Sequence, residues 1–149
     1  MELRARYTFF SDISKCLRMI RQGVGMIGTA NIQPMIGVSS LEKATGFYGG
    51  MLGLKVVREN PYEVVYQSGD GQFSIYQTDY AGSNKATYAT WEVDDIEAEV
   101  AELTGKGVSF EHYDMPGVTR AGAIHVLGES GEKAAWFKDP DGNVLCLHQ

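Results

Sequence analysis

Cysteine is scarce in this chain, and long apolar runs are missing. Cys16 and Cys146 lie far apart, so they form neither a disulfide framework nor a CxxC metal motif. No stretch approaches the roughly 18 apolar residues of a membrane span. The basic start is not followed by the continuous apolar region of a signal peptide. We therefore expect a cytoplasmic protein in a reducing compartment, with no membrane partner.

Basic residues are also in deficit, with 13 Lys and Arg against 19 Asp and Glu and a net charge of −6. A nucleic-acid surface needs clustered Lys and Arg, so no nucleic-acid partner is expected. Hydrophobic residues make up 44% of the chain and charged residues 21%, which is the composition of a globular protein. A length of 149 residues suits one ordinary domain or two small fused modules.

Residues 1–29 differ from the rest because they are basic. Ile13, Cys16, Leu17 and Ile20 recur at helical spacing. We interpret this segment as an N-terminal extension with a short amphipathic helix that packs on the body or on a partner. A membrane-surface helix and a start codon read too far upstream of Met26 are the alternatives.

From residue 30 onward the chain repeats one pattern. The first copy, residues 30–80, begins with an expected strand at 31–38. An S-x-x-E capping box at 39–42 then starts a helix that runs to Gly53. Alternating apolar residues and Gly- or Pro-containing turns predict three further strands. These strands are expected at residues 54–59, 63–68 and 72–78.

The second copy, residues 87–149, follows a linker at 81–86 and repeats the order of strand, cap, helix and glycine. Asp94 and Asp95 precede the helix, and Gly105 and Gly107 close it. Strands are expected at 87–93, 108–113, 123–128, 134–138 and 144–148. The sequence therefore predicts an α+β fold, a single domain over residues 30–149 with two tandem βαβββ modules that form a curved mixed sheet around a cleft.

Three segments resemble motifs of the vicinal oxygen chelate superfamily. They are VSSLEKATGFYGGMLGL (38–54), WEVDDIEA (91–98) and FKDPDGNVLCL (137–147). This superfamily includes glyoxalase I, bleomycin-resistance proteins, extradiol dioxygenases, fosfomycin-resistance enzymes and methylmalonyl-CoA epimerase. The resemblance covers about residues 30–149 and implies the two-module fold. One superfold hosts many chemistries, so the site must decide the function.

In metal-using members, the resemblance implies four inward-facing ligands, mostly His, Glu or Gln. The corresponding positions here are Gln33, Ser74 (or Tyr76 in a shifted register), Tyr88 and Cys146. A Gln carbonyl is a weak ligand, and a tyrosine would have to ionise from a pKa of about 10. Cys146 has no second cysteine beside it. We therefore expect no metal and no other cofactor at these positions.

The same strand faces predict the lining of a ligand cleft. The candidate residues are Gln33, Met35, Ser74, Tyr76, Tyr88, Thr90, Glu92, Cys146 and His148. Tyr66, Tyr113 and Trp136 are further aromatic candidates, which suit a flat or amphipathic organic ligand.

Some of these residues also have a catalytic interpretation. Cys146 and His148 share a strand face, but residues two apart on a strand are about 7 Å apart, too far for a direct hydrogen bond. Cys146 is then a buried, inert thiol. Glu92 is either a general base inside the cleft or a solvated side chain at its rim. His112 and His125 are interpreted as ordinary strand histidines.

Two functions compete. The first is a homodimeric, metal-independent protein that binds a small organic molecule in an aromatic cleft, by bleomycin-resistance-like sequestration or with an unknown ligand. The alternative is a metal-dependent glyoxalase-like lyase or isomerase with Gln33 and atypical ligands such as Glu92 or His125. Whether the two modules pair within one chain or swap with a second chain stays open.

Overall fold

The computed structural model describes residues 27–149, which divide after Ile32 into two units. In the first, Ile27–Thr29 forms a single 3₁₀ turn, η1. The predicted helix around Ile13 to Ile20 lies outside the described residues. The second unit, Gln33–Gln149, contains every other element. No helix in the described part of the chain is long and apolar enough to cross a membrane.

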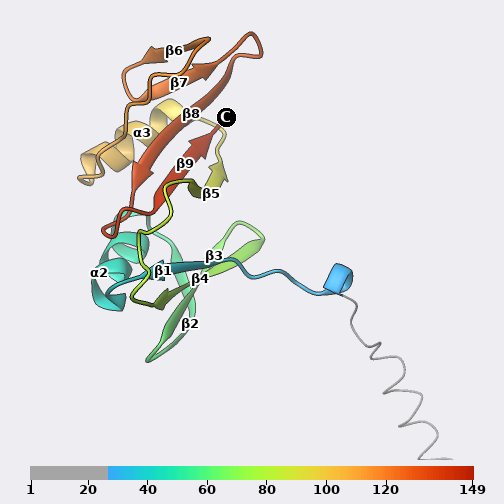
Figure 1. The fold of residues 1–149 in the computed structure, drawn as a ribbon, viewed down its shortest axis with the longest axis vertical. Helices are drawn as coiled ribbons and strands as arrows, with labels where there is room; N and C mark the ends of the chain where they lie inside the picture. Colours follow the sequence, from blue (N-terminus) through green and yellow to red (C-terminus); the bar gives the residue numbers. More distant parts are fainter. Residues whose placement is uncertain (1–26) are drawn as a thin grey trace, which may run out of the picture. The chain divides into compact units, whose positions relative to one another are not determined.

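The first module is a four-stranded sheet with one interrupted helix (Figure 1). Its elements in chain order are β1 (Met35–Val38), α2 (Leu41–Thr45), η2 (Gly46–Met51), β2 (Lys55–Asn60), β3 (Glu63–Ser68) and β4 (Gly71–Gln77). The sheet order is β1-β4-β3-β2, with β1 parallel to β4 and the other pairs antiparallel. This is the predicted βαβββ arrangement.

The second module is a five-stranded sheet with one helix, α3. Its elements are β5 (Thr87–Glu92), α3 (Ile96–Gly105), β6 (Val118–Ala121), β7 (Ile124–Leu127), β8 (Glu132–Lys138) and β9 (Val144–His148). The order is β5-β9-β8-β7-β6, with only β5 and β9 parallel. The prediction of two tandem α+β modules is confirmed, and the second module has five strands, one more than the βαβββ pattern contains.

Several predicted boundaries are wrong. Residues 108–113 form no strand and contribute only a single bridge between Phe110 and Phe137. The strand β6 was not predicted. β1 begins at Met35 rather than at residue 31, because Pro34 has no N–H to donate to a ladder.

The first helix also differs from its prediction. It begins with a cap by Ser40, whose hydroxyl accepts from the Lys43 N–H, while Ser39 bonds Asp141 instead of closing a capping box. After Thr45 the α-helix changes to the wider π form of η2. Three glycines between residues 46 and 50 lower the α-helical propensity there.

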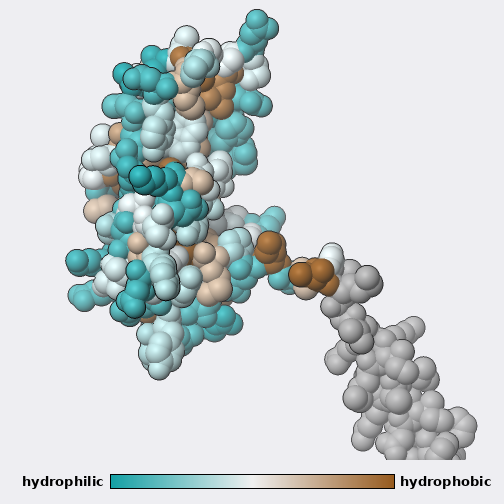
Figure 2. Space-filling model, viewed as in Figure 1, coloured by the Kyte–Doolittle hydropathy of each residue, from teal (hydrophilic) through white to brown (hydrophobic). Residues whose placement is uncertain are grey.

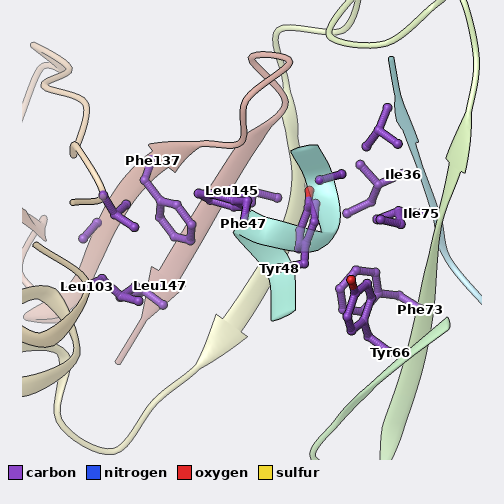
Figure 3. Close-up of a cluster of buried hydrophobic side chains, with 14 of the residues drawn as sticks. Ile36, Phe47, Tyr48, Tyr66, Phe73, Ile75, Leu103, Phe137, Leu145 and Leu147 are labelled. Atoms are coloured by element: carbon purple, nitrogen blue, oxygen red, sulfur yellow. The ribbon is translucent and has the colours of Figure 1, made fainter. Parts of the chain in front are cut away.

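A single apolar core joins the two modules. In Figure 3, Phe47 and Tyr48 lie between Leu145 and Phe137 on one side and Ile36, Ile75 and Phe73 on the other. The Phe47 ring centroid is 6.4 Å from that of Phe137 and 5.2 Å from that of Tyr48. The helical segment of module one therefore packs between both sheets, and the opposite sheet faces have no described helix on them.

Candidate functional site

The uncovered face of the second sheet carries the residues that sequence alternation predicted. Leu145 and Leu147 belong to the core. Cys146 points to the other face, where its neighbours across the ladder are Thr90 and Trp136. His148 lies beside Glu92 on the same face. The period-2 alternation of a strand places these side chains together.

Glu92 and His148 form an ion pair at this face. The His148 Nδ1 atom is 3.0 Å from a Glu92 carboxylate oxygen. The hydrogen bond and the nearby negative charge raise the pKa of the His148 imidazole above its usual value. The Glu92 side chain is largely exposed, so the pair lies at the solvated rim rather than inside a closed site.

Cys146 has the properties of an unreactive thiol. It is 4% exposed, and its Sγ lies 3.1 Å from the Leu147 carbonyl oxygen. Burial raises the pKa of the Cys146 thiol to about 11 because the charged thiolate is poorly solvated there. It makes no hydrogen bond to the His148 ring, whose hydrogen bonds go to Glu92.

An aromatic cluster lies on the same sheet face. The Trp136 ring is 5.1 Å from the His125 ring and 5.7 Å from the Tyr113 ring, both edge-on. His125 is fully buried, and its Nε2 atom is 3.1 Å from both the backbone nitrogen and the backbone oxygen of Tyr113. His125 therefore connects the backbone of Tyr113 to β7. His112 is exposed and lies outside any strand.

The first sheet holds the remaining predicted positions. The Gln33 amide donates to the Glu63 carboxylate over 3.2 Å. Ser74 is fully buried, and its hydroxyl has no hydrogen-bond partner among residues 27–149. Tyr76 is partly exposed on the same face, whereas Tyr66 points into the core.

The four positions for which the resemblance implies metal ligands carry donors that suit a divalent metal poorly. Gln33 offers a neutral amide already bonded to Glu63. Ser74 offers a buried hydroxyl, Tyr88 a phenol and Cys146 a buried thiol with a raised pKa. Within the described residues, no three His, Cys, Asp or Glu side chains gather in a group that could hold a metal ion. The donor chemistry therefore does not fit a metal centre.

An open pocket lies where the two modules meet. It has a volume of about 360 Å³ and lies between β1 and β4 of the first sheet and β5 of the second. Three of the nine predicted cleft residues line it, namely Met35, Tyr88 and Thr90. Met35 is 49% exposed and Tyr88 is 37% exposed, so both side chains are available to a ligand.

Sequence alternation missed part of this pocket. Trp91 lines it, although Trp91 has the core-facing parity of β5, and its indole N–H donates to the Ser68 hydroxyl of module one over 2.9 Å. Phe73 is a further aromatic wall. Because β5 is an edge strand, residues from both of its faces reach a groove at that edge.

Comparison with known proteins agrees with this architecture. The family described as the Glyoxalase/Bleomycin resistance protein/Dioxygenase superfamily matches residues 32–147. The chain belongs to this superfamily. No curated protein sequence matches the chain.

Solved structures of the superfamily share the fold. A glyoxalase family protein from Enterococcus faecalis has a TM-score of 0.63 at 22% identity, over 83% of this chain and 100% of that one. A bleomycin-binding protein complexed with bleomycin has a TM-score of 0.60 at 20% identity, over 81% and 98%. TnmS3, an antibiotic binding protein from Streptomyces sp. CB03234, has a TM-score of 0.60 at 24% identity, over 84% and 98%.

Proposed function

We propose that this superfamily member binds a small organic molecule, without a metal, in the pocket between its two modules. The observation that carries the proposal is the lining of that pocket: the rings of Phe73, Tyr88 and Trp91 with Met35 beside them. A volume of about 360 Å³ is within the range of small-molecule sites, which combine apolar walls with a few polar groups. The Thr90 hydroxyl and the Tyr88 phenol supply polar groups here.

The ligand class follows from the same residues. Aromatic rings and a thioether suit a flat or amphipathic organic molecule. The net charge of −6 favours a cationic ligand over an anionic one. Two similar structures are of proteins named for binding bleomycin or an antibiotic, which supports sequestration of such a compound as the working function.

We further propose that the chain works as a homodimer. The strands β1 and β5 are each at the edge of a sheet, and both line the pocket. An exposed strand edge is a ready site for pairing with another chain. Sedimentation equilibrium over a range of concentrations tests this: a monomer at all concentrations would contradict it.

A thermal-shift titration with metal-free bleomycin and a panel of flat organic cations tests the ligand proposal, because a ligand that binds only the folded state raises the Tm. Tyr88→Ala should reduce the shift. Tyr80→Ala is the matched control, since Tyr80 is exposed and lies outside the pocket. A shift that is unchanged in Tyr88→Ala, or no shift with any compound, would overturn the proposal.

Elemental analysis of the purified protein tests metal independence. We expect no stoichiometric Ni, Zn, Fe or Mn, and no change in metal content in Gln33→Ala. One tightly held metal ion per chain that is lost in Gln33→Ala would instead support the lyase or isomerase alternative.

A further inference from the structure

A second cavity lies on the helix side of the module boundary, away from the uncovered sheet faces. Its volume is about 130 Å³. Leu52 and Leu54 line it from module one, and Val93, Leu103 and Phe137 line it from module two. It shares only Trp91 with the pocket of the proposed function. The walls are therefore almost entirely apolar, and the cavity is a separate site.

One carboxylate, that of Glu99, interrupts this apolar lining. Helix α3 carries three glutamates. Glu97 pairs with Lys133 over 2.7 Å, and Glu102 pairs with Lys106 over 2.6 Å. Glu99 makes no ion pair with any residue of 27–149. The two α3 carboxylates that lie away from the cavity are therefore paired with lysines, whereas the carboxylate that lines the cavity makes no ion pair with any residue of 27–149.

We propose that this cavity binds a small organic ammonium ion, with its phenyl or branched alkyl group between the modules and its ammonium group at Glu99. A cavity of about 150 Å³ with Leu, Ile and Phe walls stays dry and takes up benzene, so the volume here suits a group of similar size. A carboxylate beside low-dielectric walls attracts a cation and repels an anion. Charge and shape thus select an arylalkylamine over the matching acid.

Benzylamine, benzyl alcohol and benzoate are suitable probes because they share one ring and differ in charge. Each is titrated into the full chain while methyl signals are followed by ¹H–¹³C NMR. We expect benzylamine to shift the methyl signals of Val93 and Leu103, benzyl alcohol to shift them at higher concentration, and benzoate to leave them unchanged. Binding of benzoate as tight as that of benzylamine would overturn the proposal.

Glu99→Gln tests the charge. Because Glu99 is exposed, its loss should weaken benzylamine binding by roughly two- to fivefold and leave benzyl alcohol binding unchanged. Glu102→Gln is the matched control on the same helix, and it should leave both affinities unchanged. Equal effects of the two substitutions, or shifts confined to residues of the other pocket such as Met35, would overturn the site. Tyr88→Ala should not alter benzylamine binding, which separates this site from that of the proposed function.

Discussion

The Tyr48 hydroxyl of module one donates a hydrogen bond of 2.9 Å to the Asp139 carboxylate of module two. Both residues are buried. The same carboxylate accepts from the backbone N–H of Asp141 and from the backbone and side chain of Asn143. The turn between β8 and β9 therefore forms a network of hydrogen bonds at the module boundary. Burial and the negative charge of Asp139 raise the pKa of Tyr48, which keeps its phenol protonated as a donor.

Replacing Tyr48 with Phe tests how much the Tyr48–Asp139 hydrogen bond contributes to stability. The ring still fills its place in the core, but the buried carboxylate loses one donor. We expect the free energy of unfolding to fall by about 1.5–3 kcal/mol, the range for a hydrogen bond to a charged group. Urea denaturation measures it. Tyr62→Phe is the control, because Tyr62 is exposed, and an equal loss in both variants would contradict the assignment.

Asn143 makes a further connection between the modules. Its side chain donates to the Gly37 carbonyl and accepts from the Gly82 N–H, and the residue is fully buried. Asn143→Ala leaves several buried groups without partners, so we expect a loss of at least about 2 kcal/mol in urea denaturation. Asn84→Ala should cost less, because the Asn84 side chain makes one exposed bond within its own loop. A loss in Asn143→Ala no larger than in Asn84→Ala would argue against the connection.

The fold could be predicted well where alternation and turn chemistry agree. β3 and β9 have the predicted bounds, because each borders a Gly-containing turn: Gly69 follows β3 and Gly142 precedes β9. The segment 108–113 also looks like a strand, but β7 occupies the edge of β8 from Glu132 to Ala134. Only a short length of that edge remains, and Phe110 and Glu111 fill it. Whether the edge of a strand is free to pair depends on the whole sheet, so it cannot be deduced from the sequence of one segment.

The candidate site was predictable only in part, for a related reason. Strand parity correctly placed Cys146 and His148 away from the core. It could not show which of these residues meet residues of the other module. Met35 and Tyr88 share a pocket, whereas Gln33 bonds Glu63 beside it in its own sheet. Figure 2 shows hydrophilic and apolar residues mixed on one face of the molecule, which by itself does not mark the site.

The Glu92–His148 pair predicts that the stability of the fold depends slightly on pH. Because Glu92 raises the pKa of His148 in the folded protein, the pair stabilises the fold fully below the unfolded histidine pKa of about 6.5. This stabilisation is lost as the pH rises through the folded pKa. Because the Glu92 side chain is largely exposed, the pair stabilises the fold by only about a few tenths of a kcal/mol.

An NMR titration of the His148 ring measures this pKa directly. We expect the wild-type value to be above 6.5 and to fall toward it in Glu92→Gln and in high salt. Glu111→Gln removes a carboxylate that pairs with Lys138 instead and should not change the His148 titration. A His148 titration that Glu92→Gln does not alter would show that the pair is absent in solution.

We predict that the Cys146 thiol reacts slowly in the folded protein and readily in the unfolded protein. A thiol with a pKa of about 11 has roughly a hundredth or less of the thiolate that a free cysteine has at pH 7.5, and burial blocks access further. In Cys16→Ser, where Cys146 is the remaining cysteine, we expect no reaction with a disulfide reagent over minutes in the native state and one thiol per chain in urea. Rapid reaction of the native protein would instead indicate an activated thiol, and Cys146 would then have to be considered as a nucleophile.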